Sequence, residues 1–180
     1  MIDETKLRAS MRDFILQQGV TIISPESCPA QFSALMFQPK LVFAAALAAC
    51  IFQSPEIFLG LGLVLWWGAV APRWNLFDLL YNSTAGRSAG AWRLPPAPSP
   101  RRFAQGFAGA FALSIAILLF SGLVLPAAIL EILFMLGNVS VLLRKFCAGA
   151  YIYNLFASQG QLGRRQEQQT SCAGKETRAR

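Results

Sequence analysis

The stretch from Phe103 to Leu125, FAQGFAGAFALSIAILLFSGLVL, decides the fold class. It runs for 23 residues without a charge, and its only polar side chains are Gln105, Ser114 and Ser121. A helix needs about 20 mostly apolar residues to cross a hydrocarbon core about 30 Å thick. A surface helix of a water-soluble bundle would carry a polar face instead. The stretch therefore predicts a membrane-spanning helix.

Three more apolar stretches predict further spans, at about 32–52, 57–71 and about 126–143. The first contains Pro39, which we expect to kink a helix, and Lys40, which can extend toward the headgroups. Together the four stretches predict an all-α, polytopic membrane four-helix bundle. Rows of small residues, such as Ala104, Ala108 and Ala112, suit close helix packing within the bundle or in a homodimer.

The two halves of the chain resemble each other at an offset of 71 to 72 residues. Ser54–Pro55 matches Leu125–Pro126, and Tyr81–Asn82 matches Tyr153–Asn154. Membrane proteins often contain such repeats, so the pattern predicts two similar helical hairpins; the alternative is a pattern common to membrane hairpins. The chain is predicted to begin with an N-terminal arm at 1–27. Two membrane hairpins follow at 28–82 and 101–157, each ending in an interfacial segment, with a Pro-rich linker at 83–100 between them. A disordered basic tail is predicted at 158–180.

The charges predict the orientation. None of the 16 basic residues falls in the predicted hairpin tips at 53–56 and 121–126. Because cytoplasmic loops of membrane proteins are enriched in Lys and Arg, both termini are expected in the cytoplasm, which places the chain in a bacterial inner (plasma) membrane. Leu7, Met11, Phe14 and Ile15 share one face of a predicted arm helix that could lie on anionic lipid; the alternative is a solvated arm. Such lipid at the cytoplasmic face is an expected partner, and no nucleic acid is.

Composition excludes several kinds of chemistry. Charged residues make up 14% of the chain, against about 25% in soluble domains, and His is absent. Without His there is no Ser-His-Asp triad and no His-ligated metal. The four Cys form no C-x-x-C pair, so neither a metal site nor a cofactor is evident.

Cys147 is the candidate reactive thiol. It follows Arg144 and Lys145, and nearby cations lower a thiol pKa and raise its reactivity. The alternative is a small apolar residue near the end of a helix. Arg144 and Lys145 are also candidate interfacial residues.

Three polar residues lie within predicted spans: Glu131, Asn138 and Gln105. Ionisable groups inside a membrane are costly and often functional. Glu131 and Asn138 are seven positions apart and share roughly one face, which favours packing across helices or a transport pathway.

Arg73, Asn75 and Asp78 are candidate interfacial residues, and we expect Asp78 to form a local ion pair with Arg73. The segments 74–81 and 146–156 either lie along the interface or continue the spans before them.

The segments Arg101–Gly106 (RRFAQG) and Phe146–Gly149 (FCAG) resemble a bacterial family of small four-span integral membrane proteins of unknown function, marked by R-F-x-Q and F-C-x-G motifs. The resemblance covers roughly residues 28–157. Related sequences often place a second Cys where this chain has Ala150, which leaves a single thiol here. The layout also resembles, more distantly, redox-associated membrane proteins of the DoxX type.

These observations favour a non-enzymatic accessory or partner subunit of the membrane. One alternative is a redox component that uses Cys147 with a thioredoxin-like partner or a quinone. The other is a small solute transporter that works as a dimer around Glu131 and Asn138.

Overall fold

The computed structural model describes residues 4–22, 24–87 and 91–157, and every regular element in these ranges is helical. This confirms the predicted all-α class. The helices are α1 (Glu4–Gln17), α2 (Cys28–Phe52), α3 (Pro55–Val70), α4 (Leu76–Ser83), α5 (Ser99–Phe120), α6 (Val124–Arg144) and α7 (Ala148–Ala157). Short 3-10 turns occupy Pro25–Ser27, Pro72–Trp74 and Ala85–Arg87. The predicted tail at 158–180 lies outside the described residues.

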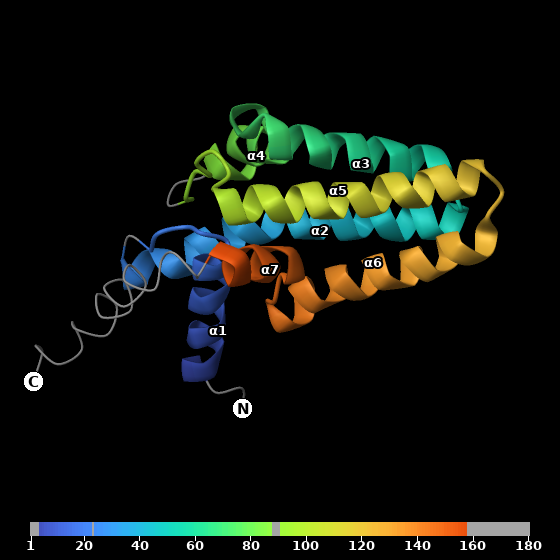
Figure 1. Ribbon diagram of the computed structural model, residues 1–180. Helices are drawn as coiled ribbons and strands as arrows, with labels where there is room; N and C mark the ends of the chain where they lie inside the picture. The colour runs from blue at the N-terminus through green and yellow to red at the C-terminus, as the bar shows by residue number, and fades with distance from the viewer. Residues whose placement is uncertain (1–3, 23, 88–90, 158–180) are drawn as a thin grey trace, which may run out of the picture.

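Three helices, α2, α5 and α6, are long and apolar enough to cross a membrane. The remaining predicted span, at 57–71, corresponds to α3, which is apolar but has only 16 residues. At about 1.5 Å per residue it measures roughly 24 Å, which is shorter than the hydrocarbon core. Figure 1 shows α3 running alongside α5 for most of its length, and α3 also contacts α2, so it belongs to the same bundle.

The helix boundaries differ from the predicted spans at both ends of the bundle. α2 begins at Cys28 rather than near Phe32, and Pro39 lies inside the helix. α5 covers Ser99–Phe120, four residues earlier than predicted at its start and five at its end. Its early end follows from Gly122, whose φ of +71° turns the chain back toward α6. Glycine adopts this conformation without steric strain.

Glycines bring α3 and α5 into very close contact. A Cβ atom built on Gly62 would lie 2.7 Å from Leu113 Cγ, and one on Gly109 would lie 2.6 Å from Trp66 Cδ1. Neither position has room for a side chain, so the two backbones approach each other more closely than larger residues would allow. This pair of helices shares the most extensive contact in the described structure.

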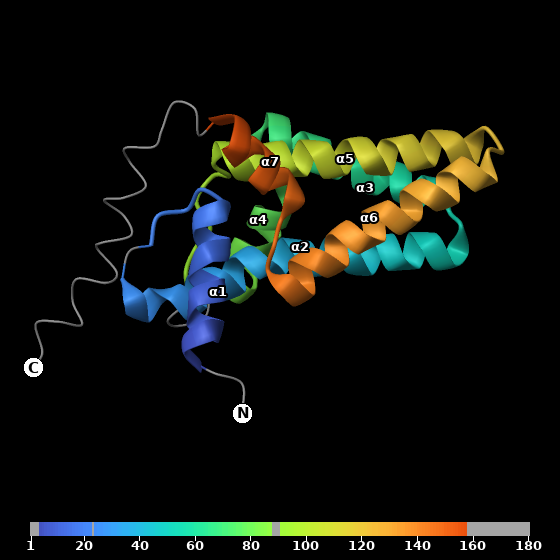
Figure 2. The same cartoon turned by 60° about the horizontal axis from the view of Figure 1, so that its bottom comes forward.

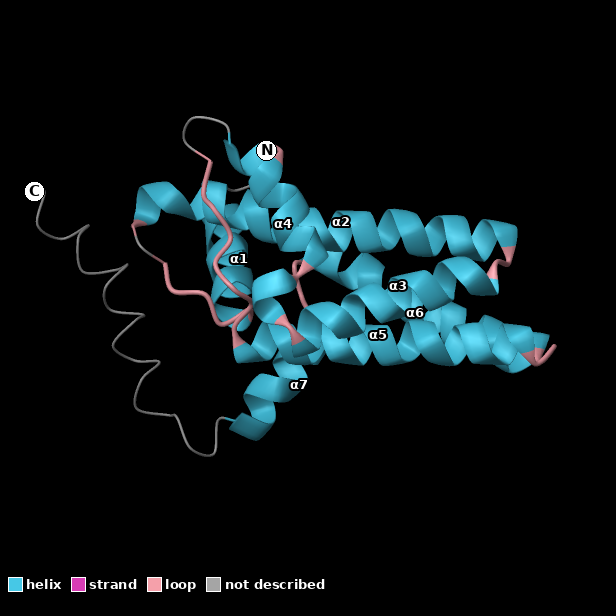
Figure 3. Cartoon of the chain, turned by 90° about the horizontal axis from the view of Figure 1, so that it is seen from above, coloured by secondary structure: helices cyan, strands magenta, loops and turns pink. Residues whose placement is uncertain are grey.

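The polypeptide leaves the bundle after α3 and after α6, so the segments 74–81 and 146–156 do not continue these spans. α4 and α7 are separate helices beyond the turns that follow. α7 folds back onto α5, where Gly149 sits against the backbone of Ala104. Figure 2 shows α6 leaving α5 obliquely and α7 returning to it. Figure 3 shows α1, α4 and α7 at one end of the bundle and the two tight turns at the other.

Two apolar clusters form the interior. One lies within the long helices and includes Phe58, Leu65 and Ile115. The other lies at the α1 end, where Phe14 of α1 contacts Phe32 of α2 edge to face, with ring centroids 5.7 Å apart. Phe14 and Ile15 are buried there, so the apolar face of the predicted arm helix packs on protein.

Candidate functional site

A buried polar cluster joins α2, α4 and α5 at the α4 end of the bundle. Arg101 of α5 binds the Asp78 carboxylate with both terminal nitrogens, and its Nη1 lies 3.2 Å from Asp78 Oδ2. Arg101 Nη2 also donates to Gln38 Oε1 at 2.9 Å. Gln105 Nε2 donates to the same Gln38 oxygen at 2.8 Å. We call these four residues the Arg101 cluster.

Local structure directs these side chains inward. Asn75 begins α4, and its Oδ1 accepts from the Phe77 backbone N–H, which fixes the first turn. Asp78 lies three residues later on the side facing α5. On α5, Arg101 and Gln105 are one turn apart and therefore share a face. All four members of the cluster are at least nine-tenths buried.

The cluster contains a buried ion pair between Arg101 and Asp78. Desolvation raises the pKa of Asp78, and the Arg101 guanidinium opposes that shift. Each charge neutralises the other, so removing one would leave an isolated charge in a dry environment. The Gln105 Oε1 atom is buried without a hydrogen-bond partner. The cluster thus ties α4 to two long helices.

The expected pair between Asp78 and Arg73 does not form. Arg73 lies in the turn before α4 and is exposed, whereas Asp78 faces inward to Arg101. Sequence reasoning placed Gln105 among the polar candidates but missed Arg101 and Gln38. The four-residue spacing of Arg101 and Gln105 was the available signal, since it puts two polar side chains on one face of an apolar helix.

Glu131 lies near the opposite end of the bundle in a second polar group. Its Oε2 accepts from Gln53 Nε2 at 3.0 Å, and the side chain also contacts Cys50. Its Oε1 is buried and has no partner. Asn138 is not part of this group, because its Nδ2 donates to the Phe134 carbonyl of its own helix.

Replacing Glu131 tests what this carboxylate contributes. We expect Glu131→Gln to leave thermal stability in detergent nearly unchanged, because the amide fills the same volume and its oxygen can still accept from Gln53. Glu131→Ala should lower stability by about 1–3 kcal/mol, because it leaves a cavity at a buried position and removes one of the two acceptors of Gln53 Nε2. A large loss for Glu131→Gln would show that the fold requires the carboxyl group itself.

Cys147 lies between α6 and α7 and contacts residues of α1. Its backbone N–H donates to Gln17 Oε1 at 2.9 Å, and the residue packs half-buried against the cluster around Phe14. Lys145 Nζ donates to Ser10 Oγ at 3.1 Å and lies over the Phe32 ring, 5.3 Å from its centroid. Arg144 is exposed. Among the described residues, Cys28, Cys50 and Cys147 form no disulfide.

The space between the two polar groups is apolar. Along the bundle, the Arg101 cluster and Glu131 are separated by the cluster that contains Ala46, Leu61, Leu65 and Ala112. Within the described residues, no three His, Cys, Asp or Glu side chains gather in a way that could hold a metal ion.

A family model described as a domain of unknown function, DUF4395, matches residues 33–158 of the chain. This is more than half of the sequence. The chain belongs to the DUF4395 family. The matched region begins within α2 and continues past the end of α7, so it contains both polar groups of this DUF4395 protein. The expected resemblance to an uncharacterised family is thereby confirmed. No curated protein and no solved structure matches the chain.

Proposed function

We propose that this DUF4395 protein crosses a bacterial inner membrane four times, with both termini in the cytoplasm. The three long apolar helices support the membrane location. The fourth span would be α3, because its close packing along α5 requires the two to lie in the same layer. The hairpin turns at 53–54 and 121–123 carry no Lys or Arg, whereas Arg73, Arg93 and Lys145 lie toward the other end.

Within that membrane, we propose a role as a non-enzymatic accessory or partner subunit. The observation that carries this proposal is that the buried polar residues of the Arg101 cluster bind one another. Arg101, Asp78, Gln38 and Gln105 engage one another and hold three helices together. The interior beyond them is closed by apolar side chains. Such an interior suits a rigid element that is recognised by another membrane protein.

The test is the composition of the native complex. The tagged protein is extracted from its own membrane in a mild detergent, and the intact assembly is weighed by native mass spectrometry. The proposal expects a different membrane polypeptide in a fixed ratio to this chain. A monomer or a homodimer alone, at every detergent concentration that preserves the helices, would contradict it.

Transport is the second candidate, and the unpartnered Glu131 oxygen is the feature that favours it. The apolar cluster between Glu131 and the Arg101 cluster weighs against a continuous polar pathway. Reconstituted liposomes distinguish the two ideas. Solute or proton flux that depends on the protein and disappears in Glu131→Gln would support transport, and the absence of flux at any protein density would oppose it. A redox role for Cys147 has weaker support, since Lys145 is directed toward Ser10 and Phe32.

A further inference from the structure

The helix α4 exposes three leucines, whereas the polar residues Asn75 and Asp78 are buried with Tyr81 on the side that faces the bundle. Its inward face carries Asn75 and Asp78, which are 0% and 5% exposed. Its outward face carries Leu76, Leu79 and Leu80, which are 44–50% exposed. A surface helix in water would place these residues the other way round. The outward face of α4 is therefore built to contact an apolar medium.

Aromatic residues extend this apolar surface toward α3. Trp67 and Trp74 are 55% and 66% exposed, and the Trp67 indole N–H donates to the Trp74 carbonyl at 3.1 Å. Tryptophan is enriched where hydrocarbon meets headgroups. The pair therefore places the turn between α3 and α4 at the level of a membrane interface.

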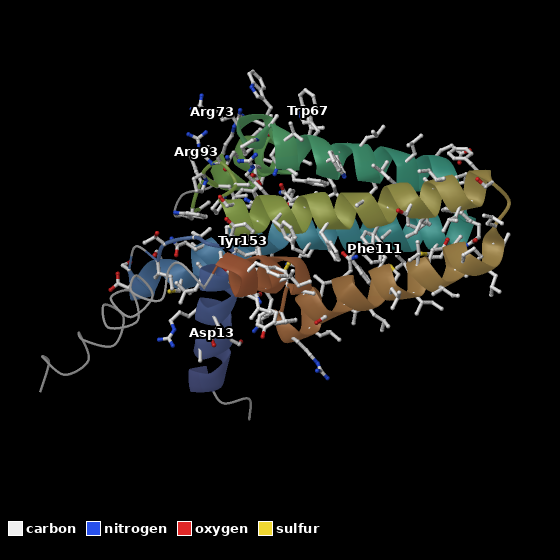
Figure 4. All side chains as sticks on the ribbon, viewed as in Figure 1. Asp13, Trp67, Arg73, Arg93, Phe111 and Tyr153 are labelled. Atoms are coloured by element: carbon white, nitrogen blue, oxygen red, sulfur yellow. The ribbon has the colours of Figure 1, made fainter. Side chains whose placement is uncertain are left out.

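Three exposed arginines lie beside α4, and we call Arg73, Arg87 and Arg93 the α4 arginines. Arg73 precedes the helix, and Arg87 is in the turn that follows it. Arg93 is held near α4 because its neighbour Leu94 exchanges two hydrogen bonds with the Asn82 side chain, at 2.9 and 3.0 Å. Figure 4 shows Arg73 and Arg93 at the same end of the bundle, with Trp67 on that side.

These cations are available to an outside anion. No carboxylate among the described residues forms an ion pair with any α4 arginine. The one carboxylate of α4, Asp78, faces inward and is neutralised by Arg101. The helix is eight residues long, about 12 Å at 1.5 Å per residue, so Arg73 at one end and Arg87 at the other can contact neighbouring headgroups.

We propose that the outward face of α4 and the α4 arginines form a binding site for anionic phospholipids. The leucines enter the boundary between headgroups and acyl chains, and the guanidinium groups bind lipid phosphate. Guanidinium is suited to this because its planar set of N–H donors matches phosphate oxygens. The proposal rests on the proposed membrane location, and it adds a defined site for the lipid contact.

The experiment measures which lipids the intact protein retains. The protein is reconstituted in nanodiscs of phosphatidylglycerol and phosphatidylcholine in a known ratio, and the lipids that remain bound are identified by native mass spectrometry. The test variant is Arg73→Gln with Arg93→Gln. The control is Lys40→Gln with Arg144→Gln, which removes the same charge from two other exposed positions. All four substitutions affect exposed residues, so the fold should be retained.

We expect the wild-type protein and the control to retain phosphatidylglycerol well above its bulk ratio. The test variant should lose about fivefold in this preference for each arginine removed. The preference should also weaken as salt is raised, because the arginines are exposed. Equal losses in the test and control variants would overturn the α4 site, as would a retained-lipid ratio equal to the bulk. Failure of the wild-type protein to enter nanodiscs would instead overturn the proposed membrane location.

Discussion

Replacing Arg101 with Leu should destabilise the protein by about 3–5 kcal/mol. The substitution leaves the Asp78 carboxylate buried without its counter-ion, and it removes a donor from Gln38. Removing one member of a buried ion pair typically has an effect of this size. The measurement is the free energy of unfolding in mixed micelles, followed by circular dichroism as a denaturing detergent is titrated in.

The double variant Asp78→Leu with Arg101→Leu gives the decisive comparison. Because no unpaired charge remains, we expect it to recover most of the stability lost by Arg101→Leu. Arg144→Leu serves as the control, since Arg144 is exposed and its loss should change stability by less than about 0.5 kcal/mol. If Arg101→Leu were as mild as Arg144→Leu, the buried ion pair would not hold α4 in place.

A methyl group added at Gly109 should destabilise the protein by about 1–3 kcal/mol, although alanine is the better helix former. The new Cβ in Gly109→Ala would lie 2.6 Å from Trp66 Cδ1, 3.1 Å from the Gly62 carbonyl oxygen and 3.2 Å from the Trp66 backbone nitrogen. Two of these atoms belong to the α3 backbone, so a rotamer change of Trp66 alone would leave two tight contacts. The helices α3 and α5 must move apart.

Gly60 and Gly137 provide matched controls, because a Cβ at either position would meet nothing within 4 Å. Both are in helices, so Gly60→Ala and Gly137→Ala should leave stability unchanged or raise it by up to about 1 kcal/mol. The opposite signs at Gly109 and at the controls separate helix packing from helix propensity. Thermal unfolding of the four proteins in one detergent checks this, and equal shifts at all three glycines would contradict the close packing of α3 on α5.

Hydropathy was sufficient to locate the long helices, because apolar stretches such as Phe103–Leu125 can be satisfied only in a membrane or a large core. Their ends were harder to predict. The end of α5 depends on the positive φ of Gly122, and α2 begins upstream of Phe32 because Pro29 is accommodated in its first turn. Pro39 lies inside α2, within the single span that the sequence predicts there.

The Arg101 cluster shows what sequence reasoning could not supply. Asp78 and Arg101 are 23 positions apart, and their ion pair joins α4 to α5. The nearest cation along the chain, Arg73, was therefore the natural choice of partner. This prediction was wrong because the direction of a side chain depends on its position in the helix. Asp78 faces the bundle from within α4, whereas Arg73 lies in the turn before α4.

The most direct test of the central claim maps the two ends of the bundle across the membrane of intact cells. Single cysteines are introduced by Glu56→Cys and Ser121→Cys at the hairpin turns, and by Arg93→Cys near α4, in a chain whose own four cysteines are replaced by serine. All three positions are exposed, so a maleimide that cannot cross membranes can reach them wherever its compartment is accessible.

The account predicts that Glu56→Cys and Ser121→Cys are labelled in intact cells and that Arg93→Cys is labelled only after the membrane is permeabilised. Labelling of Glu56→Cys and Ser121→Cys from opposite sides would contradict it, because it would leave an odd number of crossings between them. Labelling of all three proteins in intact cells, or of none, would contradict it equally.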